Sequence, residues 1–287
     1  MHTLVIVLLL LVILSFLSPA TRIRLRPALL AAVPVILTLV FSGLALASGA
    51  FSFPLALLVL AYCLAPVLAA LVQGPALVEH PTWLDFAIIL MLWLPLEFSL
   101  GAQLIPKPAQ GFLHTVAYGI AIILALVIFL DFRTLTGMKY NLPHARDLAY
   151  GVAGFVLTTP ILIAAGRLLN FIPPFHVPAH PSARGISLTF AAIFFGTALP
   201  EEILFRSLIQ NWFMQRYGFT LRMLLVSGFI FGCAHLDNGP QPLPNWRYMI
   251  LATIAGIAYG KVFQKSNSVF SSVTFHALVD ATKHIFF

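Results

Sequence analysis

Apolar stretches of about 20 residues follow one another along almost the whole chain, and they restrict it to folds that lie in a bilayer. A helix of that length crosses about 30 Å of hydrocarbon, and only helices and closed barrels satisfy their backbone polar groups there. We expect spans at residues 3–20, 28–48, 53–73, 83–100, 111–131, 147–166, 186–215, 219–236, 247–264 and 267–287. The predicted fold class is all-α, a polytopic transmembrane helix bundle of about ten spans, with eight to ten as the range.

The composition excludes an ordinary soluble domain and a nucleic-acid-binding protein. Hydrophobic residues make up 60% of the chain and charged residues only 9%, whereas soluble domains carry about a quarter charged residues. The net charge of +7 comes from basic residues scattered singly between apolar runs, which makes no basic stripe for a phosphate backbone. Most of these residues fall on connections that are cytoplasmic if both termini lie outside. The expected partner is the lipid bilayer.

A proline-rich connection at residues 167–185 predicts a boundary between two parts of the chain. It contains Pro173, Pro174, Pro178 and Pro181. We assign residues 1–166 to an N-terminal transmembrane region of about six spans and residues 180–287 to a second domain. In the first part, Asp85 lies near a span end, where we expect a structural or snorkelling role.

The most informative stretch is Leu199-Pro200-Glu201-Glu202-Ile203-Leu204-Phe205-Arg206, because it puts two carboxylates inside an apolar helix. Such residues are costly at membrane depth and indicate a functional site. Glu202 and Arg206 are spaced i, i+4 and share one helix face, so Arg206 can neutralise and orient Glu202. Glu201 points about 100° away. We expect it to face a cavity, where a poorly hydrated carboxylate suits general-base chemistry.

Two further helices carry polar pairs at the same spacing. One contains Phe231 and His235, and the other contains His276 and Asp280. Counted from the basic residues at the inner membrane boundary, at about 1.5 Å per residue, Glu201, His235, His276 and Asp280 reach heights of about 22, 20, 16 and 22 Å. We therefore expect the four side chains to converge in one layer.

These motifs resemble a known family when they are taken in order. Glu-Glu-x-x-x-Arg at 201–206, Phe-x-x-x-His at 231–235 and His-x-x-x-Asp at 276–280 are similar to the motifs of the CAAX-processing and bacteriocin-processing intramembrane endopeptidases, also called the CPBP or Abi family. The resemblance covers residues 180–287, which it implies form an intramembrane protease domain. It implies a multi-pass protein, which we place in a bacterial cytoplasmic membrane.

The resemblance also implies a reaction and a role for each site residue. Glu201 and His235 would activate water for peptide hydrolysis, His276 and Asp280 would stabilise the oxyanion, and Glu202, Arg206 and Phe231 would orient the site. The mechanism would be of the glutamic type, without metal or other cofactor, and the substrate a membrane-anchored or lipidated protein. Position 280 is often asparagine in the family, and an ionised Asp280 cannot donate a hydrogen bond. Either Asp280 is protonated, or it fixes the tautomer of His276 and His276 alone donates.

Three alternatives remain at this point. A zinc-dependent intramembrane protease could use Glu201, His235, His276 and Asp280 as ligands, although the chain has no HExxH motif. A non-catalytic bacteriocin-immunity or scaffold protein could use the same fold to bind a peptide. A transporter could use the ionisable groups as a proton relay, but no internal repeat supports it. The oligomeric state does not follow from the sequence.

Overall fold

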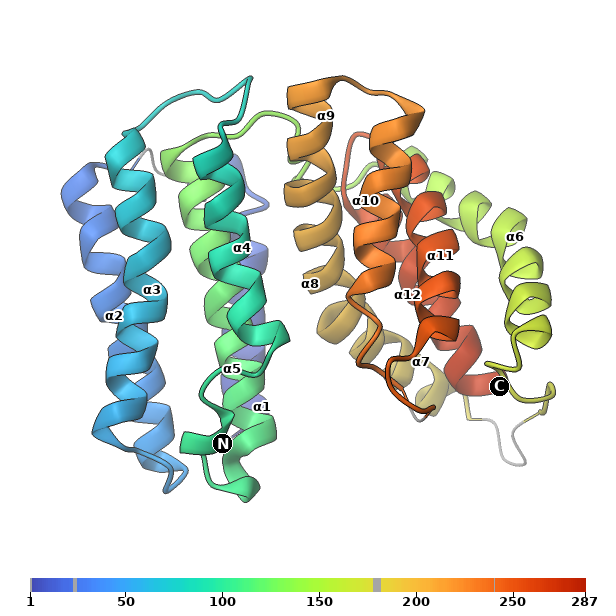
Figure 1. The fold of residues 1–287 in the computed structure, drawn as a ribbon, viewed down its shortest axis with the longest axis horizontal. Helices are drawn as coiled ribbons and strands as arrows, with labels where there is room; N and C mark the ends of the chain where they lie inside the picture. Colours follow the sequence, from blue (N-terminus) through green and yellow to red (C-terminus); the bar gives the residue numbers. More distant parts are fainter. Residues whose placement is uncertain (1, 23–24, 178–181, 240) are drawn as a thin grey trace. The chain divides into compact units, whose positions relative to one another are not determined.

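The structure, a computed structural model, describes residues 2–22, 25–177, 182–239 and 241–287. These residues form 10 long helical segments (Figure 1). Within them, β pairing is confined to one isolated bridge between Val78 and Leu135. The prediction of an all-α fold is confirmed.

The chain divides into two compact units, residues 1–136 and 137–287. In the first unit the helices are α1 (His2–Ser15), α2 (Pro27–Ala47), α3 (Phe53–Gln73), α4 (Trp83–Glu97) and α5 (Lys107–Leu126), with the short turns η1 (Pro19–Thr21) and η2 (Ala102–Leu104) and the π-helical η3 (Val127–Phe132) after α5. In the second unit the helices are α6 (Ala145–Leu168), α10 (Leu221–Cys233), α11 (Trp246–Lys265), α12 (Phe270–Phe286) and a long segment from Ala183 to Tyr217. That segment comprises α7 (Ala183–Ile193), η4 (Phe194–Ala198), α8 (Leu199–Glu202), η5 (Ile203–Gln210) and α9 (Asn211–Tyr217).

The structure places α6 in the second unit, whereas the proline-rich connection had suggested that it closes the first. Helix α6 packs against α11 and α12. A Cβ atom added at Gly151 would approach the Ser271 carbonyl oxygen to 2.5 Å, and one at Gly154 would approach the Phe275 ring to 2.8 Å. The two glycines therefore let α12 lie close against α6, a contact that local composition does not reveal. Of the predicted connection, Pro178 and Pro181 lie outside the described residues.

Helix starts follow capping residues in the sequence. Ser52 accepts a hydrogen bond from the Leu55 backbone N–H at the start of α3. Thr82 and Asp85 form a reciprocal capping box at the start of α4. Asn245 accepts from the Tyr248 N–H at the start of α11. Each cap satisfies a backbone donor that the first helical turn leaves open.

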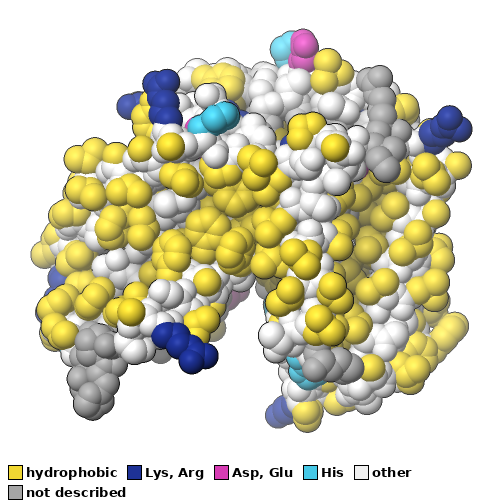
Figure 2. All heavy atoms as spheres, turned by 180° about the vertical axis from the view of Figure 1, so that it is seen from behind, with side chains coloured by type: hydrophobic (Ala, Val, Ile, Leu, Met, Phe, Trp, Pro, Cys, Tyr) yellow, Lys and Arg dark blue, Asp and Glu magenta, His cyan; other side chains and the backbone are white. Residues whose placement is uncertain are grey.

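The helices fit a multi-pass integral membrane protein. Five of the described helices are long and apolar enough to cross a membrane, namely α2, α3, α5 with η3, α6 and the Ala183–Tyr217 segment, and two shorter ones, α1 and α10, are also apolar. Figure 2 shows hydrophobic side chains over broad areas of the visible face. Such apolar exposure is what a lipid environment requires.

The first unit is built around α5 and a buried ion pair. Helix α5 contacts α1, α2 and α4, and every residue from Gly119 to Phe129 is buried. Asp85 is 1% exposed and accepts from Arg133 Nε at 3.0 Å, while Arg133 Nη1 donates to the Gly74 carbonyl oxygen at 2.9 Å. Asp85 therefore has a structural role in the interior instead of snorkelling to the membrane boundary.

Candidate active site

The Glu201-Glu202 pair lies in a short α-helical turn between two π-helical stretches, η4 and η5. Pro200 has no backbone N–H and cannot donate to the preceding turn. π-Helical turns widen a helix locally and are frequent at functional sites. The helix therefore departs from regular α-helical geometry on both sides of Glu201 and Glu202.

Glu202 and Arg206 form the buried pair that their spacing predicts. Arg206 Nε lies 3.1 Å from Glu202 Oε2, and both side chains are 0% exposed. Arg206 Nη1 donates to Gln210 Oε1 at 3.4 Å, and Gln210 Nε2 donates to the Gly260 carbonyl oxygen at 3.0 Å. A Cβ atom at Gly260 would collide with Gln210 Oε1, so the glycine allows α11 to receive this side chain. The guanidinium of Arg206 also lies 4.8 Å from the centre of the Phe231 ring.

His276 lies between three carboxylates. Its Nδ1 is 3.0 Å from Glu202 Oε1, and its Nε2 is 3.4 Å from Asp280 Oδ2 and 3.9 Å from Glu201 Oε2. Glu202 thus bridges Arg206 and His276 with its two oxygens. The partner of His276 Nδ1 is therefore Glu202, and Asp280, which we had considered as the group that fixes the His276 tautomer, lies beside Nε2. Adjacent in sequence, Glu201 and Glu202 reach opposite edges of one imidazole ring, as their divergent helical directions require.

His235 faces the same region from the end of α10, where it is 7% exposed. Its Nδ1 lies 2.8 Å from the Phe231 carbonyl oxygen. A carbonyl oxygen only accepts, so Nδ1 carries the proton and Nε2 of the neutral ring keeps its lone pair. His235 lines one cavity together with His276 and Asp280, and the common depth of the four side chains stays a prediction.

Aromatic rings surround the two histidines. Tyr259 stacks on His276 with a centroid distance of 4.7 Å and an interplanar angle of 19°, and Phe231 meets the same ring edge-on at 5.8 Å. Tyr248 meets His235 edge-on at 4.6 Å. The sequence reasoning identified Phe231 but missed both tyrosines. Their i, i+11 separation on α11 places them about three turns apart, which is a weak signal in a helix with other aromatic residues.

A cavity of about 90 Å³ opens beside these groups and is lined by His235, His276, Asp280, Phe231, Tyr248, Tyr259 and residues of α6, α11 and α12. Lys283 also lines it, with Nζ lying 4.7 Å from the Tyr248 ring centre and 4.8 Å from that of Phe171. Among the predicted site residues, Glu202 and Arg206 are fully buried. The side chains of Glu201 and Asp280 are 30% and 29% exposed. Of the two, Asp280 lines the cavity, whereas Glu201 Oε2 is buried.

No group of three or more His, Cys, Asp or Glu side chains in the described part of the chain has a geometry that could hold a metal ion. Of the candidate zinc ligands, Glu201 and Asp280 lie 3.9 and 3.4 Å from His276 Nε2, as ion-pair partners of that ring. In this arrangement the site can hold and move protons, because acceptor carboxylates lie beside both nitrogens of one imidazole.

The fold and the site together define a polytopic helical membrane protein with a buried carboxylate and histidine cluster. Residues 183–282 match the family described as type II CAAX prenyl endopeptidase Rce1-like, so this part of the chain is an Rce1-like domain of the CPBP/Abi family. The match contains all three motifs and confirms the resemblance seen in the sequence. It covers roughly a third of the chain. No curated protein and no solved structure matches the chain.

Proposed function

We propose that this protein is an intramembrane endopeptidase of the glutamic type, and that it hydrolyses a peptide bond of a membrane-anchored or lipidated protein. The observation that carries the proposal is that the three family motifs meet around one ring, His276, beside a cavity. Membership of residues 183–282 in an endopeptidase family implies proteolysis. The ten helical segments would then be about ten membrane spans, in a bacterial cytoplasmic membrane.

In this proposal, Glu201 and His235 activate the attacking water. Glu201 lies at the edge of His276 that also faces Asp280, since its Oε2 is 3.9 Å from Nε2. His235 offers the lone pair of Nε2, because its Nδ1 donates to Phe231. The water loses a proton to Glu201 as it attacks the amide carbonyl, and the carboxylic acid returns the proton to the leaving amine.

His276 would be the oxyanion donor, with Asp280 as its acceptor in the resting site. Glu202 holds the Nδ1–H, so that an Nε2–H is directed toward Asp280 and Glu201. In a ring that also carries a proton on Nε2, this N–H would point toward the two carboxylates. When the carbonyl oxygen gains charge, this donor can turn from Asp280 to the oxyanion. Glu202 and Arg206 act here as positioning residues.

The substrate class rests on the family and on the membrane setting. The family description names a prenyl endopeptidase acting on CAAX sequences, and we extend it to this chain as a lipidated or membrane-anchored protein. Cleavage would take place near the membrane boundary. We place the site in the outer half of the bilayer, because its residues are about 16 to 22 Å above the inner boundary if both termini lie outside.

A proteomic comparison of cells carrying wild-type protein or Glu201→Gln tests this function. The substitution barely changes shape but removes the base, so an uncut membrane-protein precursor should accumulate. Glu79→Gln is the matched control, because it makes the same chemical change at an exposed position of the first unit. A cellular phenotype that survives Glu201→Gln would favour the immunity or scaffold alternative.

A further inference from the structure

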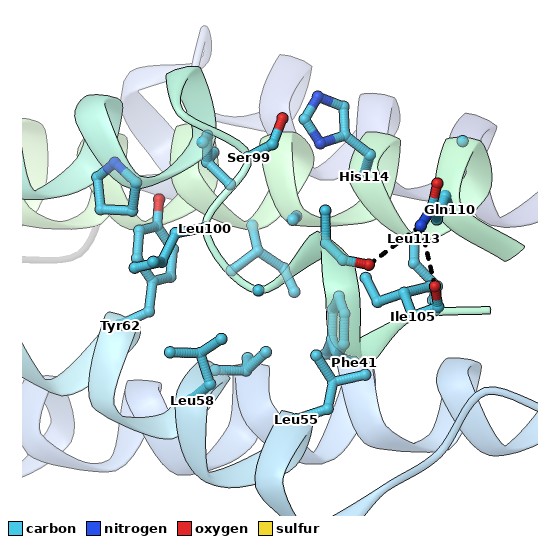
Figure 3. Close-up of a pocket in the computed structure, with 18 residues that line it drawn as sticks. Phe41, Leu55, Leu58, Tyr62, Ser99, Leu100, Ile105, Gln110, Leu113 and His114 are labelled. Atoms are coloured by element: carbon cyan, nitrogen blue, oxygen red, sulfur yellow. Dashed lines mark hydrogen bonds between the residues drawn. The ribbon is translucent and has the colours of Figure 1, made fainter. Parts of the chain in front are cut away.

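The first unit contains a cavity of its own, with a volume of about 290 Å³ (Figure 3). Its walls come from α2, α3, the end of α4, the segment between α4 and α5, and the first half of α5. Nothing in the proposed proteolytic chemistry uses this cavity.

The cavity runs lengthwise along α5 from near the start of this helix. Helix α5 begins at Lys107, which is exposed, and its lining residues extend from Gln110 to Ile120. At about 1.5 Å per residue, these positions lie about 5 to 20 Å from the helix start. The cavity is therefore an elongated space that follows α5 inward from its exposed first turn.

Apart from Tyr62, the polar side chains of the lining come from one wall, which they share with apolar residues. Figure 3 shows Ser99, Gln110 and His114 on the side of α5 and its preceding segment, while Leu55 and Leu58 face them from α3. Gln110 Nε2 donates to the carbonyl oxygens of Ala102 and Ile105 at 3.1 and 3.0 Å, which fixes the segment over the cavity.

The deeper wall is apolar even where it contains a hydroxyl. The Tyr62 hydroxyl donates to the Leu92 carbonyl oxygen at 2.7 Å, so the ring, with Phe41 and Leu113, provides hydrocarbon surface. No Asp, Glu, Lys or Arg is among the residues lining the cavity. The chemistry suits a ligand with a long apolar part and a small polar end, and it gives no partner to a strongly charged group within the lining.

The volume equals that of about ten water molecules. Cavities lined by aliphatic and aromatic groups tend to stay dry and to take apolar ligands, and ligand pockets of about 300 Å³ upward are common. A bilayer supplies hydrocarbon chains at the mouth of such a site. An amphiphile is thus a better occupant than a column of water.

We propose that this cavity binds one hydrocarbon chain that carries a small polar end. The chain lies along Leu55, Leu58 and Leu113, and the polar end meets Ser99 and Gln110 near the membrane boundary. The chain belongs either to a free single-chain amphiphile, such as a long-chain alcohol, or to one acyl tail of a bilayer phospholipid.

Photo-crosslinking of the full chain in vesicles tests the proposal. One arm uses a diazirine-bearing long-chain alcohol, and the other uses phosphatidylcholine with the same diazirine in one acyl chain. Peptide mapping should find label on the segments that contain Leu58, Leu100 and Leu113. Label from the alcohol identifies a free amphiphile and label from phosphatidylcholine alone identifies a bilayer lipid, and either result supports the site.

Two variants of α3 give a matched comparison. Leu58→Trp fills the cavity and should lower labelling of these segments by about tenfold or more. Leu57→Trp makes the same change at a position that is 50% exposed and outside the lining, so it should leave labelling unchanged.

Competition provides a second measurement that does not depend on the folding of a variant. Excess unlabelled long-chain alcohol should suppress labelling of the wild-type cavity segments. Labelling that is not saturable, labelling that Leu58→Trp leaves unchanged, or label confined to lipid-facing residues would overturn the proposal.

Discussion

Replacement of Arg206 by methionine tests whether the ion pair beneath His276 supports the fold. Arg206 is 0% exposed and contacts Glu202, Gln210 and the Phe231 ring. Arg206→Met keeps much of the side-chain volume but removes the guanidinium partner of the buried Glu202 carboxylate and leaves it with His276 alone. Removing one partner of a buried ion pair costs about 3–5 kcal/mol, so we expect the free energy of unfolding to fall by about that amount.

The double variant Glu202→Gln, Arg206→Met separates this explanation from simple loss of packing. It leaves no unpaired charge at the pair, and replacing a whole buried ion pair is often nearly neutral. We therefore expect it to be more stable than Arg206→Met, with a coupling energy of about 2 kcal/mol or more.

Denaturant titration in mixed micelles, followed by tryptophan fluorescence, measures these free energies, because Trp212 is fully buried in α9. Arg184→Met is the control, since Arg184 is exposed in α7 of the same helical segment, and it should change stability by less than about 0.5 kcal/mol. A loss below about 1 kcal/mol for Arg206→Met, as for a solvated pair, would refute the reasoning. So would additive effects of the two substitutions.

Three further predictions follow from the structure. His235→Gln should lower kcat by about 10²–10⁴ with an unchanged unfolding midpoint, and an unchanged kcat would remove His235 from water activation. Gly260→Ala should lower the free energy of unfolding by about 1–3 kcal/mol, because the added Cβ displaces Gln210. Its control is Gly43→Ala, where a Cβ has no neighbour within 4 Å. In the same titration this control should be neutral or stabilising by about 0.5 kcal/mol. Asp85→Ala should lower the free energy of unfolding by about 3–5 kcal/mol, because it leaves the buried Arg133 without its carboxylate partner. Asp237→Ala, at an exposed position, should have little effect on the same free energy. Equal losses of stability in the two variants would contradict this prediction.

The sequence predicted where the helices lie because apolar runs mark them. Its prediction of ten full-length spans is confirmed only for five, because α1, α4 and α10 have 14, 15 and 13 residues. The pairing of Glu202 with Arg206 was predictable because both lie on one helix, where i, i+4 geometry is local. The contact between Glu202 and His276 was not, because it joins residues 74 positions apart and depends on how two helices rotate against each other.

Residues that act through packing were also hidden in the sequence. Tyr248 and Tyr259 resemble any other apolar aromatic residue until the neighbouring helices are in place. The boundary of the units was expected at the prolines because they interrupt helices, but Gly151 and Gly154 join α6 to α12 across that interruption. The two units are defined by contacts between helices, and the proline-rich connection does not mark their boundary.

Cleavage of a lipidated membrane-anchored peptide by the purified protein in vesicles tests the central claim most directly. Wild-type protein and Glu79→Gln should release the product with and without EDTA, while Glu201→Gln should be slower by about 10²–10⁴ with an unchanged unfolding midpoint. Full activity of Glu201→Gln would contradict the role of Glu201 as base. Loss of wild-type activity in EDTA with rescue by zinc would instead establish a metal-dependent protease.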